Sequence, residues 1–207
     1  GYFGYETIGL VEKLPRAASD PLGLPDMIFV RPTVILIFDR LADSLFLVAP
    51  VWPGEGRDAE AMLSAAADRI DATAARLASA PLPPKVAADA IEAVAQSTTS
   101  ADDYAAMVRQ AKDYITAGDI FQVVLAQRFT APFALPPIEL YRALRRVNPS
   151  PFLYFLDLPG FALTGSSPEI LVRVRDDEVT IRPIAGTRPR GKSREEDEAN
   201  RTSLLAD

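Results

Sequence analysis

The sequence predicts an α+β protein built on antiparallel sheets. Runs rich in β-branched and aromatic residues occur near both ends of the chain, at 26–52 and 152–184. Between them, apolar residues recur at helical spacing in two longer segments. The turn signals between consecutive strand-like runs are short, which favours antiparallel neighbours over parallel crossovers. Sheet-rich ends with helices between them are typical of the α+β class.

The first half of the chain predicts a pair of strands followed by one long helix. Residues 26–40 and 44–52 are the two strand-like runs, and a short polar segment separates them. In 57–79, apolar side chains repeat at helical spacing in an alanine-rich sequence. A proline-rich stretch then ends the predicted helix, and 80–99 is predicted as a connector.

The second half begins with a capped helix and ends in strands. Ser100 followed by Asp103 resembles a capping box, and Gly118 is predicted to end this helix. Residues 119–129 are predicted as a strand, and 136–147 as a short helix that starts with proline. Four further strand-like runs predict an antiparallel meander: 152–158, 161–167, 169–175 and 178–184. The acidic run at 194–198 is predicted to start a solvated helix.

The composition excludes several classes of function. Hydrophobic residues make up 48% of the chain and the net charge is -6, so we expect a packed core. The acidic balance argues against nucleic acid or an anionic membrane as partner, because both need a basic face. No apolar run is long enough to span a membrane, and from its first residues we expect no secretory segment. The chain has no cysteine, which excludes disulfides and fits the cytoplasm, and no histidine, the usual neutral-pH base.

The segment IRPIAGTRPRG, at 181–191, concentrates positive charge on a stiff turn of an acidic chain. It carries three arginines and two prolines. A guanidinium donates two parallel hydrogen bonds to a planar carboxylate, Gly186 allows close approach of a ligand to the backbone, and Thr187 adds a hydroxyl. The segment therefore predicts a rigid anion-binding turn at a sheet end. The alternative is a solvated loop with ordinary surface arginines.

Two polar residues on predicted strands are candidates for chemistry. Glu169 follows a proline at the start of an apolar strand, where partial burial would raise the pKa of its carboxyl and suit it to act as a general acid. Gln122 lies in a strand-like run with apolar neighbours and needs a hydrogen-bond partner there, either backbone or a ligand. The acidic run at 194–198 is weak evidence for a magnesium site.

A stiff, proline-containing turn at 148–153 leads into the aromatic strand. Two interpretations stay open for it: a loop that positions the strand, or part of a small-molecule pocket. Its residues are Asn148, Pro149, Ser150, Pro151, Phe152 and Leu153.

Taken together, five segments resemble the chorismate-utilising enzymes in their order and spacing. They are GYFGYE, AGDIFQVVLAQRF, NPSPFLYFLDL, FALTGSSPEILVRV and VTIRPIAGTRPRG. Within that family the chain resembles the large component of anthranilate synthase from Gly1 to Asp207. The resemblance implies a sandwich of antiparallel sheets with helices packed outside. It also implies an N-terminal region at 1–97 and the N-terminal part of the chorismate-binding domain at 98–207.

The resemblance implies a lyase of tryptophan biosynthesis in the cytoplasm. This enzyme would catalyse the first step of tryptophan biosynthesis. It converts chorismate and ammonia to anthranilate and pyruvate, and a glutamine amidotransferase partner supplies the ammonia. Isochorismate and salicylate synthases carry a water-activating lysine where this chain has Gln122. Aminodeoxychorismate synthases commonly carry a lysine, which attacks the substrate covalently, where this chain has Ala185. Glutamine together with alanine favours anthranilate synthase.

The resemblance also assigns residues. Glu169 corresponds to the general acid that protonates the departing 4-hydroxyl, and Gln122, Ala185, Gly186 and Thr187 are placed at the substrate. The turn at 148–153 corresponds to part of the pocket for tryptophan, the feedback inhibitor. The family often has Pro-Tyr-Met where this chain has Pro-Phe-Leu at 151–153. No metal ligand is expected in this chain, because the Mg²⁺ glutamates and the active-site histidine of the family lie downstream.

Alternatives remain for both the chain and its parent. The chain is expected to be an internal fragment of an oligomeric enzyme, inactive by itself. It could then be a catalytically inert piece with residual ligand or effector binding. The parent could instead be an aminodeoxychorismate synthase or a phenazine-type aminodeoxyisochorismate synthase.

Overall fold

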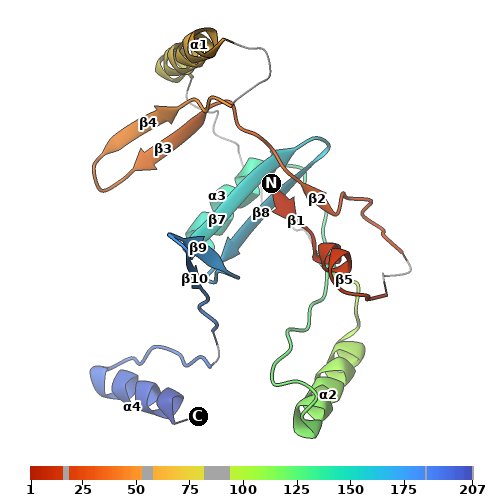
Figure 1. Ribbon diagram of the computed structural model, residues 1–207. Helices are drawn as coiled ribbons and strands as arrows, with labels where there is room; N and C mark the ends of the chain where they lie inside the picture. Colours follow the sequence, from red (N-terminus) through yellow and green to blue (C-terminus); the bar gives the residue numbers. More distant parts are fainter. Residues whose placement is uncertain (16–18, 53–57, 82–93, 185, 207) are drawn as a thin grey trace. The chain divides into compact units, whose positions relative to one another are not determined.

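The computed structural model describes residues 1–15, 19–52, 58–81, 94–184 and 186–206 (Figure 1). The chain divides into two compact units, Gly1–Asp89 and Ala90–Asp207. The boundary predicted after residue 97 concerns the domains of the family, which this division does not define, and it stays a prediction.

Both units combine helices with antiparallel pairs of strands, which confirms the α+β class. The first unit contains β1 (Tyr2–Phe3), the 3₁₀ helix η1 (Tyr5–Leu10), β2 (Met27–Ile28), β3 (Ile35–Asp39), β4 (Ser44–Val48) and α1 (Ala59–Ser79). The second contains β5 (Gln96–Ser97), α2 (Ala101–Ala117), β6 (Phe129–Thr130), α3 (Pro137–Val147), β7 (Phe152–Leu158), β8 (Phe161–Ser167), β9 (Arg173–Arg175), β10 (Glu178–Thr180) and α4 (Arg194–Leu205).

The first unit confirms the predicted long helix, and the predicted strand pair in part: the run at 26–40 forms two separate strands, β2, which pairs with β1, and β3. β3 pairs with β4 in antiparallel register. In the turn between them, the Asp39 carboxylate accepts the backbone N–H groups of Leu41 and Ala42 at 2.9 and 3.0 Å. Asp58 caps α1, because its side chain accepts the N–H of Glu60.

Helix α2 begins and ends where its capping residues predict. The Ser100 hydroxyl accepts the N–H of Asp103 at 3.1 Å and donates to the Asp103 carboxylate at 2.7 Å. Gly118 follows the last helical residue with φ 83, a left-handed conformation that glycine adopts without a steric penalty. Its N–H bonds back to the carbonyl of Ile115.

The strand predicted at 119–129 is wrong for most of its length. Only Phe129 and Thr130 form a strand, β6, which pairs with β5. Upstream, the described contacts do not form a ladder. The Leu125 carbonyl accepts a hydrogen bond from the Tyr104 hydroxyl at 3.3 Å, and only at Arg128, whose carbonyl accepts the N–H of Thr98 at 2.9 Å, does the backbone bond to the segment of β5. A β-prone sequence forms a strand only beside a neighbour that completes its hydrogen-bond ladder, and β5 has two residues to offer.

The predicted four-strand meander is two separate hairpins in the described part of the chain. β7 pairs with β8 along their whole lengths, and β9 pairs with β10, but no described pairing joins β8 to β9. The chain leaves the ladder at Ser167, where Pro168 has no N–H to donate and the Ser167 hydroxyl bonds to the backbone of Glu169.

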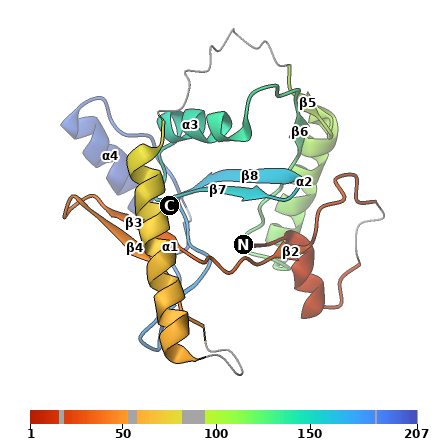
Figure 2. The same cartoon turned by 90° about the horizontal axis from the view of Figure 1, so that it is seen from above.

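Helix α3 lies against the β7–β8 hairpin, as Figures 1 and 2 both show. The rings of Tyr141 on α3 and Phe155 on β7 have their centroids 6.0 Å apart. Leu158, at the end of β7, is one of the buried hydrophobic residues. The predicted proline start of this helix is confirmed at Pro137.

Few of the described hydrophobic side chains are buried, although the composition is sufficient for a packed core. Ala66, Ala111 and Leu158 are the only buried ones among the described residues, whereas Phe121 is 94% and Leu171 91% exposed. A two-stranded hairpin covers little apolar surface, because each strand has one neighbour and each sheet needs a second layer. None of the described helices combines the length and apolar character needed to cross a membrane.

Candidate functional site

Glu169 lies in the link between β8 and β9, not at the start of a strand as predicted. The Ser167 hydroxyl accepts the N–H of Glu169 at 3.2 Å and donates to its carbonyl at 3.1 Å. The Glu169 side chain then reaches the segment after β10, where its Oε1 accepts the N–H of Ile184 at 3.2 Å. These contacts place the predicted general acid beside the start of the predicted anion-binding turn.

A solvent-open hollow of about 430 Å³ lies at this contact. That volume is within the range of small-molecule sites, about 300–1,000 Å³. Its walls are mostly apolar, and its polar members are a hydroxyl, a carboxyl and a guanidinium. The lining residues are Ser167, Glu169, Ile170, Leu171, Ile181, Arg182 and Pro183.

The residues predicted to bind substrate are only partly placed near this hollow. Gly186 and Thr187 continue the segment that carries Ile184, and Ala185 lies outside the described residues. A Cβ on Gly186 would come within 2.8 Å of Leu204 Cδ1 on α4, so this glycine allows a close approach between the segment and the helix. The Thr187 carbonyl oxygen accepts a hydrogen bond from Nη1 of Arg188 at 3.1 Å.

Gln122 is not in the buried strand that was predicted. It is exposed and lies in the irregular stretch before β6. No described side-chain hydrogen bond involves Gln122, and none links it to Glu169. Its placement at the substrate stays a prediction.

The turn at 148–153 lies at the same end of the β7–β8 hairpin as Glu169. In the β-ladder, Phe152 at the start of β7 stands opposite Ser167 at the end of β8. The carbonyl of Asn148 accepts the hydroxyl of Ser166 at 2.7 Å, which ties the turn to β8. Ser150 donates to the Asn148 side chain at 3.4 Å. Nothing described here tests the predicted effector pocket.

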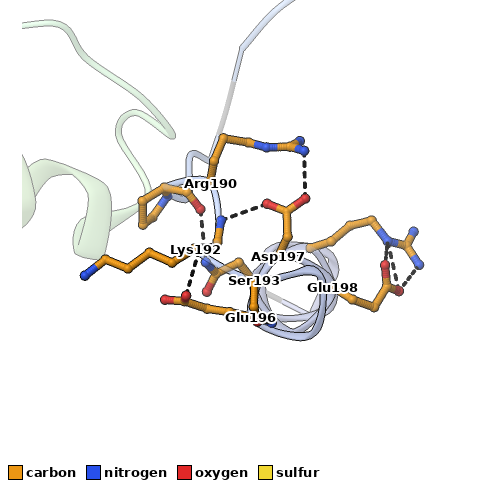
Figure 3. Close-up of polar contacts among 10 residues, drawn as sticks. Arg190, Lys192, Ser193, Glu196, Asp197 and Glu198 are labelled. Atoms are coloured by element: carbon orange, nitrogen blue, oxygen red, sulfur yellow. Dashed lines mark hydrogen bonds and ion pairs between the residues drawn. The ribbon is translucent and has the colours of Figure 1, made fainter.

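The arginine-rich segment folds back onto the first turn of α4, as Figure 3 shows. The Asp197 carboxylate accepts the N–H of Gly191 at 2.8 Å through Oδ1 and pairs with Arg190 Nη2 at 2.7 Å through Oδ2. The Glu196 carboxylate accepts the N–H of Lys192 at 2.7 Å. Arg190, one of the three arginines in the motif, is therefore held by an acid of α4.

The acidic run at 194–198 confirms the predicted helix start, and its charges have local partners. The Ser193 hydroxyl caps α4 by accepting the N–H of Glu196 at 3.2 Å. A bond to its own backbone N–H, then one to the Ser193 side chain, holds the pKa of Glu195 below its ordinary value. The Arg201 guanidinium, hydrogen-bonded to Glu198, lowers the pKa of that carboxyl. Among the described residues, no group of three or more His, Cys, Asp or Glu side chains could hold a metal ion.

Sequence reasoning missed three residues of this region. Ser167 fixes the backbone of Glu169, and serine two residues before its partner is a known turn signal. Asp197 holds the arginine-rich segment from six residues away, which no local pattern indicates. Arg182 was grouped with the other arginines, yet it lines the hollow while they do not.

Comparisons with known proteins agree on one family. The family described as chorismate binding enzyme matches residues 1–207. A relative from Cereibacter sphaeroides named anthranilate synthase component 1 is 48% identical over 208 residues, covering 100% of this chain and 42% of the relative. A Thermus thermophilus protein of the same name is 46% identical over 212 residues, covering 100% of this chain and 43% of that protein.

A solved structure shows the same fold. The crystal structure of anthranilate synthase component I from Streptococcus pneumoniae matches with a TM-score of 0.78 and 33% identity, covering 100% of this chain and 44% of that one. The chain thus spans less than half the length of the relatives that it matches.

Proposed function

Because the chain belongs to the family of chorismate-binding enzymes, we propose that it serves as part of an anthranilate synthase large component. The relatives that it resembles carry that name, and all are longer than this chain. The proposed reaction takes chorismate and ammonia to anthranilate, pyruvate and water. The observation that carries the proposal is the hydrogen bond from Ile184 to the Glu169 carboxylate, at the wall of the hollow.

Glu169 is the proposed general acid. Its Oε1 accepts the Ile184 N–H, and no described hydrogen bond takes Oε2, so Oε2 can carry the transferred proton. The proton goes to the 4-hydroxyl of chorismate, whose carbon–oxygen bond breaks as water leaves. Ammonia adds at ring carbon 2, and loss of the enolpyruvyl group as pyruvate completes the aromatic ring.

Two residues support ammonia as the nucleophile. Gln122 has no basic group with which to activate water, and ammonia needs no such activation. Ala185 has no amine with which to attack the substrate. The alternative reactions give aminodeoxychorismate or aminodeoxyisochorismate. The masses of these products differ from that of anthranilate.

The proposal also includes a metal ion, a partner protein and an inhibitor. Among the described residues no group of acidic side chains fits a Mg²⁺ site, and we propose that the ligands of that ion belong to another part of the longer protein. Ammonia would come from a glutamine amidotransferase. Tryptophan would inhibit through the turn at 148–153, and the enzyme would work in the cytoplasm.

The test is the anthranilate assay on the longer protein proposed to carry this chain. With chorismate, ammonium and Mg²⁺ we expect anthranilate fluorescence and the anthranilate mass. Glu169→Gln should lower kcat by about 100-fold or more, as loss of a general acid does. Glu178→Gln is the matched control, because this exposed glutamate of β10 lies outside the hollow. A protein that forms only isochorismate, aminodeoxychorismate or aminodeoxyisochorismate would refute the proposal.

We also propose that the 207-residue chain does not turn over chorismate by itself. The observation that favours this is the scarcity of buried hydrophobic side chains among the described residues. A site without a packed support cannot hold its groups in the reactive geometry. Anthranilate formed by the purified chain, at a rate that scales with its concentration, would contradict this.

A further inference from the structure

The three arginines of the segment 181–191 have different surroundings. Arg190 is paired with Asp197 on α4. Arg188 donates to the Thr187 carbonyl and is half-buried. Arg182 lines the hollow beside Glu169, and within the described part of the chain it forms no hydrogen bond, ion pair or ring contact. Of the three, Arg182 is thus the arginine in a position to meet a ligand in the hollow.

The other walls of the hollow indicate what kind of ligand would bind. Ile170, Leu171 and Ile181 provide apolar surface, against which a small hydrophobic body can lie. The acid in the hollow, Glu169, already has one oxygen bonded by a backbone N–H. Guanidinium is always charged and recognises carboxylates with two parallel hydrogen bonds, which are stronger beside apolar walls than in bulk water.

We propose that Arg182 binds a carboxylate group of the ligand, while the apolar body lies on the isoleucine and leucine walls. The ligand class is a compact carboxylic acid with an apolar ring and a hydroxyl that can reach Glu169. The guanidinium of Arg182 attracts a carboxylate, whereas the apolar walls do not, so the lining of the hollow fixes the orientation of the ligand. This inference rests on the proposed function, because it assigns one carboxylate of the proposed substrate to a residue.

The experiment measures binding by NMR to the longer protein proposed to carry this chain, with the arginine Nε–H groups labelled. The probes are benzoate, its neutral analogue benzamide, and chorismate. In the wild-type protein we expect benzoate and chorismate, but not benzamide, to shift the Arg182 Nε–H signal. Arg182→Gln should weaken binding of both carboxylates by about 10-fold or more. Arg182→Lys keeps the charge without the fork and should have an intermediate affinity.

Arg175→Gln is the matched control, because Arg175 is an exposed arginine of β9 that does not line the hollow. It removes the same charge and should leave both affinities unchanged. The Ile184 amide signal reports whether Arg182→Gln preserves the contact with Glu169. A variant that keeps this signal but loses benzoate supports the direct role of Arg182.

The outcomes separate the two proposals. If benzoate binding depends on Arg182 and chorismate does not bind, the inference stands and the proposed substrate is wrong. If chorismate binds equally to wild type and Arg182→Gln, the inference is overturned and the proposed function is not. Absence of carboxylate binding to the wild-type protein, or equal binding of benzamide, also overturns the inference.

Discussion

Gly191→Ala is predicted to detach the arginine-rich segment from α4. A Cβ at this position would come within 2.1 Å of the Asp197 nitrogen, 2.6 Å of its Cα and 2.6 Å of the Glu196 carbonyl carbon. All three are backbone atoms in the first turn of α4, which cannot rotate away as a side chain can. The segment must therefore move outward, and the hydrogen bonds of Gly191 and Lys192 to the helix break.

The size of the effect follows from the bonds that are lost. Hydrogen bonds to charged groups contribute about 1.5–3 kcal/mol each, and the exposed Lys192 bond lies at the low end of that range or below. The Arg190–Asp197 pair adds little, roughly 0–1 kcal/mol, because the Arg190 side chain is 90% exposed. We expect a total of about 3 kcal/mol for docking of the segment, which corresponds to roughly a 100-fold change in its local equilibrium.

Native-state amide hydrogen exchange measures this equilibrium residue by residue. In the wild-type chain, the amides of Gly191 and Lys192 should be protected by their acceptors on α4. In Gly191→Ala the protection of the amides at 191 and 192 should fall by roughly 100-fold, whereas amides inside α2 should exchange as before.

Gly9→Ala is the control, because a Cβ at Gly9 would have no atom within 4 Å. It should leave the exchange of the amides at 191 and 192 unchanged. If Gly191→Ala keeps the protection of both amides within about threefold, a difference of roughly 0.6 kcal/mol, the hydrogen bonds of Gly191 and Lys192 to α4 do not hold the segment.

Three further predictions concern local elements of the fold. Ser100→Ala should cost about 1 kcal/mol of helix stability by removing the cap of α2, measured as lost helical circular dichroism in urea, with Ser100→Thr largely restoring it. Gly165→Ala should displace the ring of Tyr154, which a Cβ would approach to 2.4 Å, and should change the chemical shifts of that ring in the NMR spectrum; unchanged shifts would refute the packing. Acidification should loosen α4, because Arg201 lowers the pKa of Glu198: the contribution is complete above about pH 4.3, the unfolded value, and is lost as pH falls through the lower folded value. The exchange of α4 amides against pH checks this, and Glu198→Gln should make the step smaller, leaving the part that comes from Glu195, whose pKa is also lowered.

Local elements were predictable from the sequence because their signals act over a few residues. The caps at Ser100 and Gly118, the proline start of α3 and the acidic start of α4 lie where the pattern placed them. The strand at 119–129 failed for a related reason, since a strand needs a partner and its own sequence does not name one. The prediction of a meander was wrong because the chain leaves the β-ladder after Ser167, at Pro168.

The candidate site shows the same division between local and non-local information. Glu169 and the segment 181–191 were singled out by residue type and by the resemblance. That Glu169 meets the N–H of Ile184, and that a hollow lies there, depends on how two hairpins place segments 15 residues apart. Gln122 was placed in a buried strand that does not form.

By itself the sequence determined the α+β class, the helix ends, the family and the chemistry available to the chain. The class, the helix ends and the chemistry rest on residue type and short-range spacing, and the family rests on the resemblance of five segments to known enzymes. Only the tertiary structure decided which arginine does what: Arg190 is bound to Asp197, and Arg182 is left facing the hollow. Identical side chains differ in role only through their neighbours, because the energy of a charge depends on the groups around it.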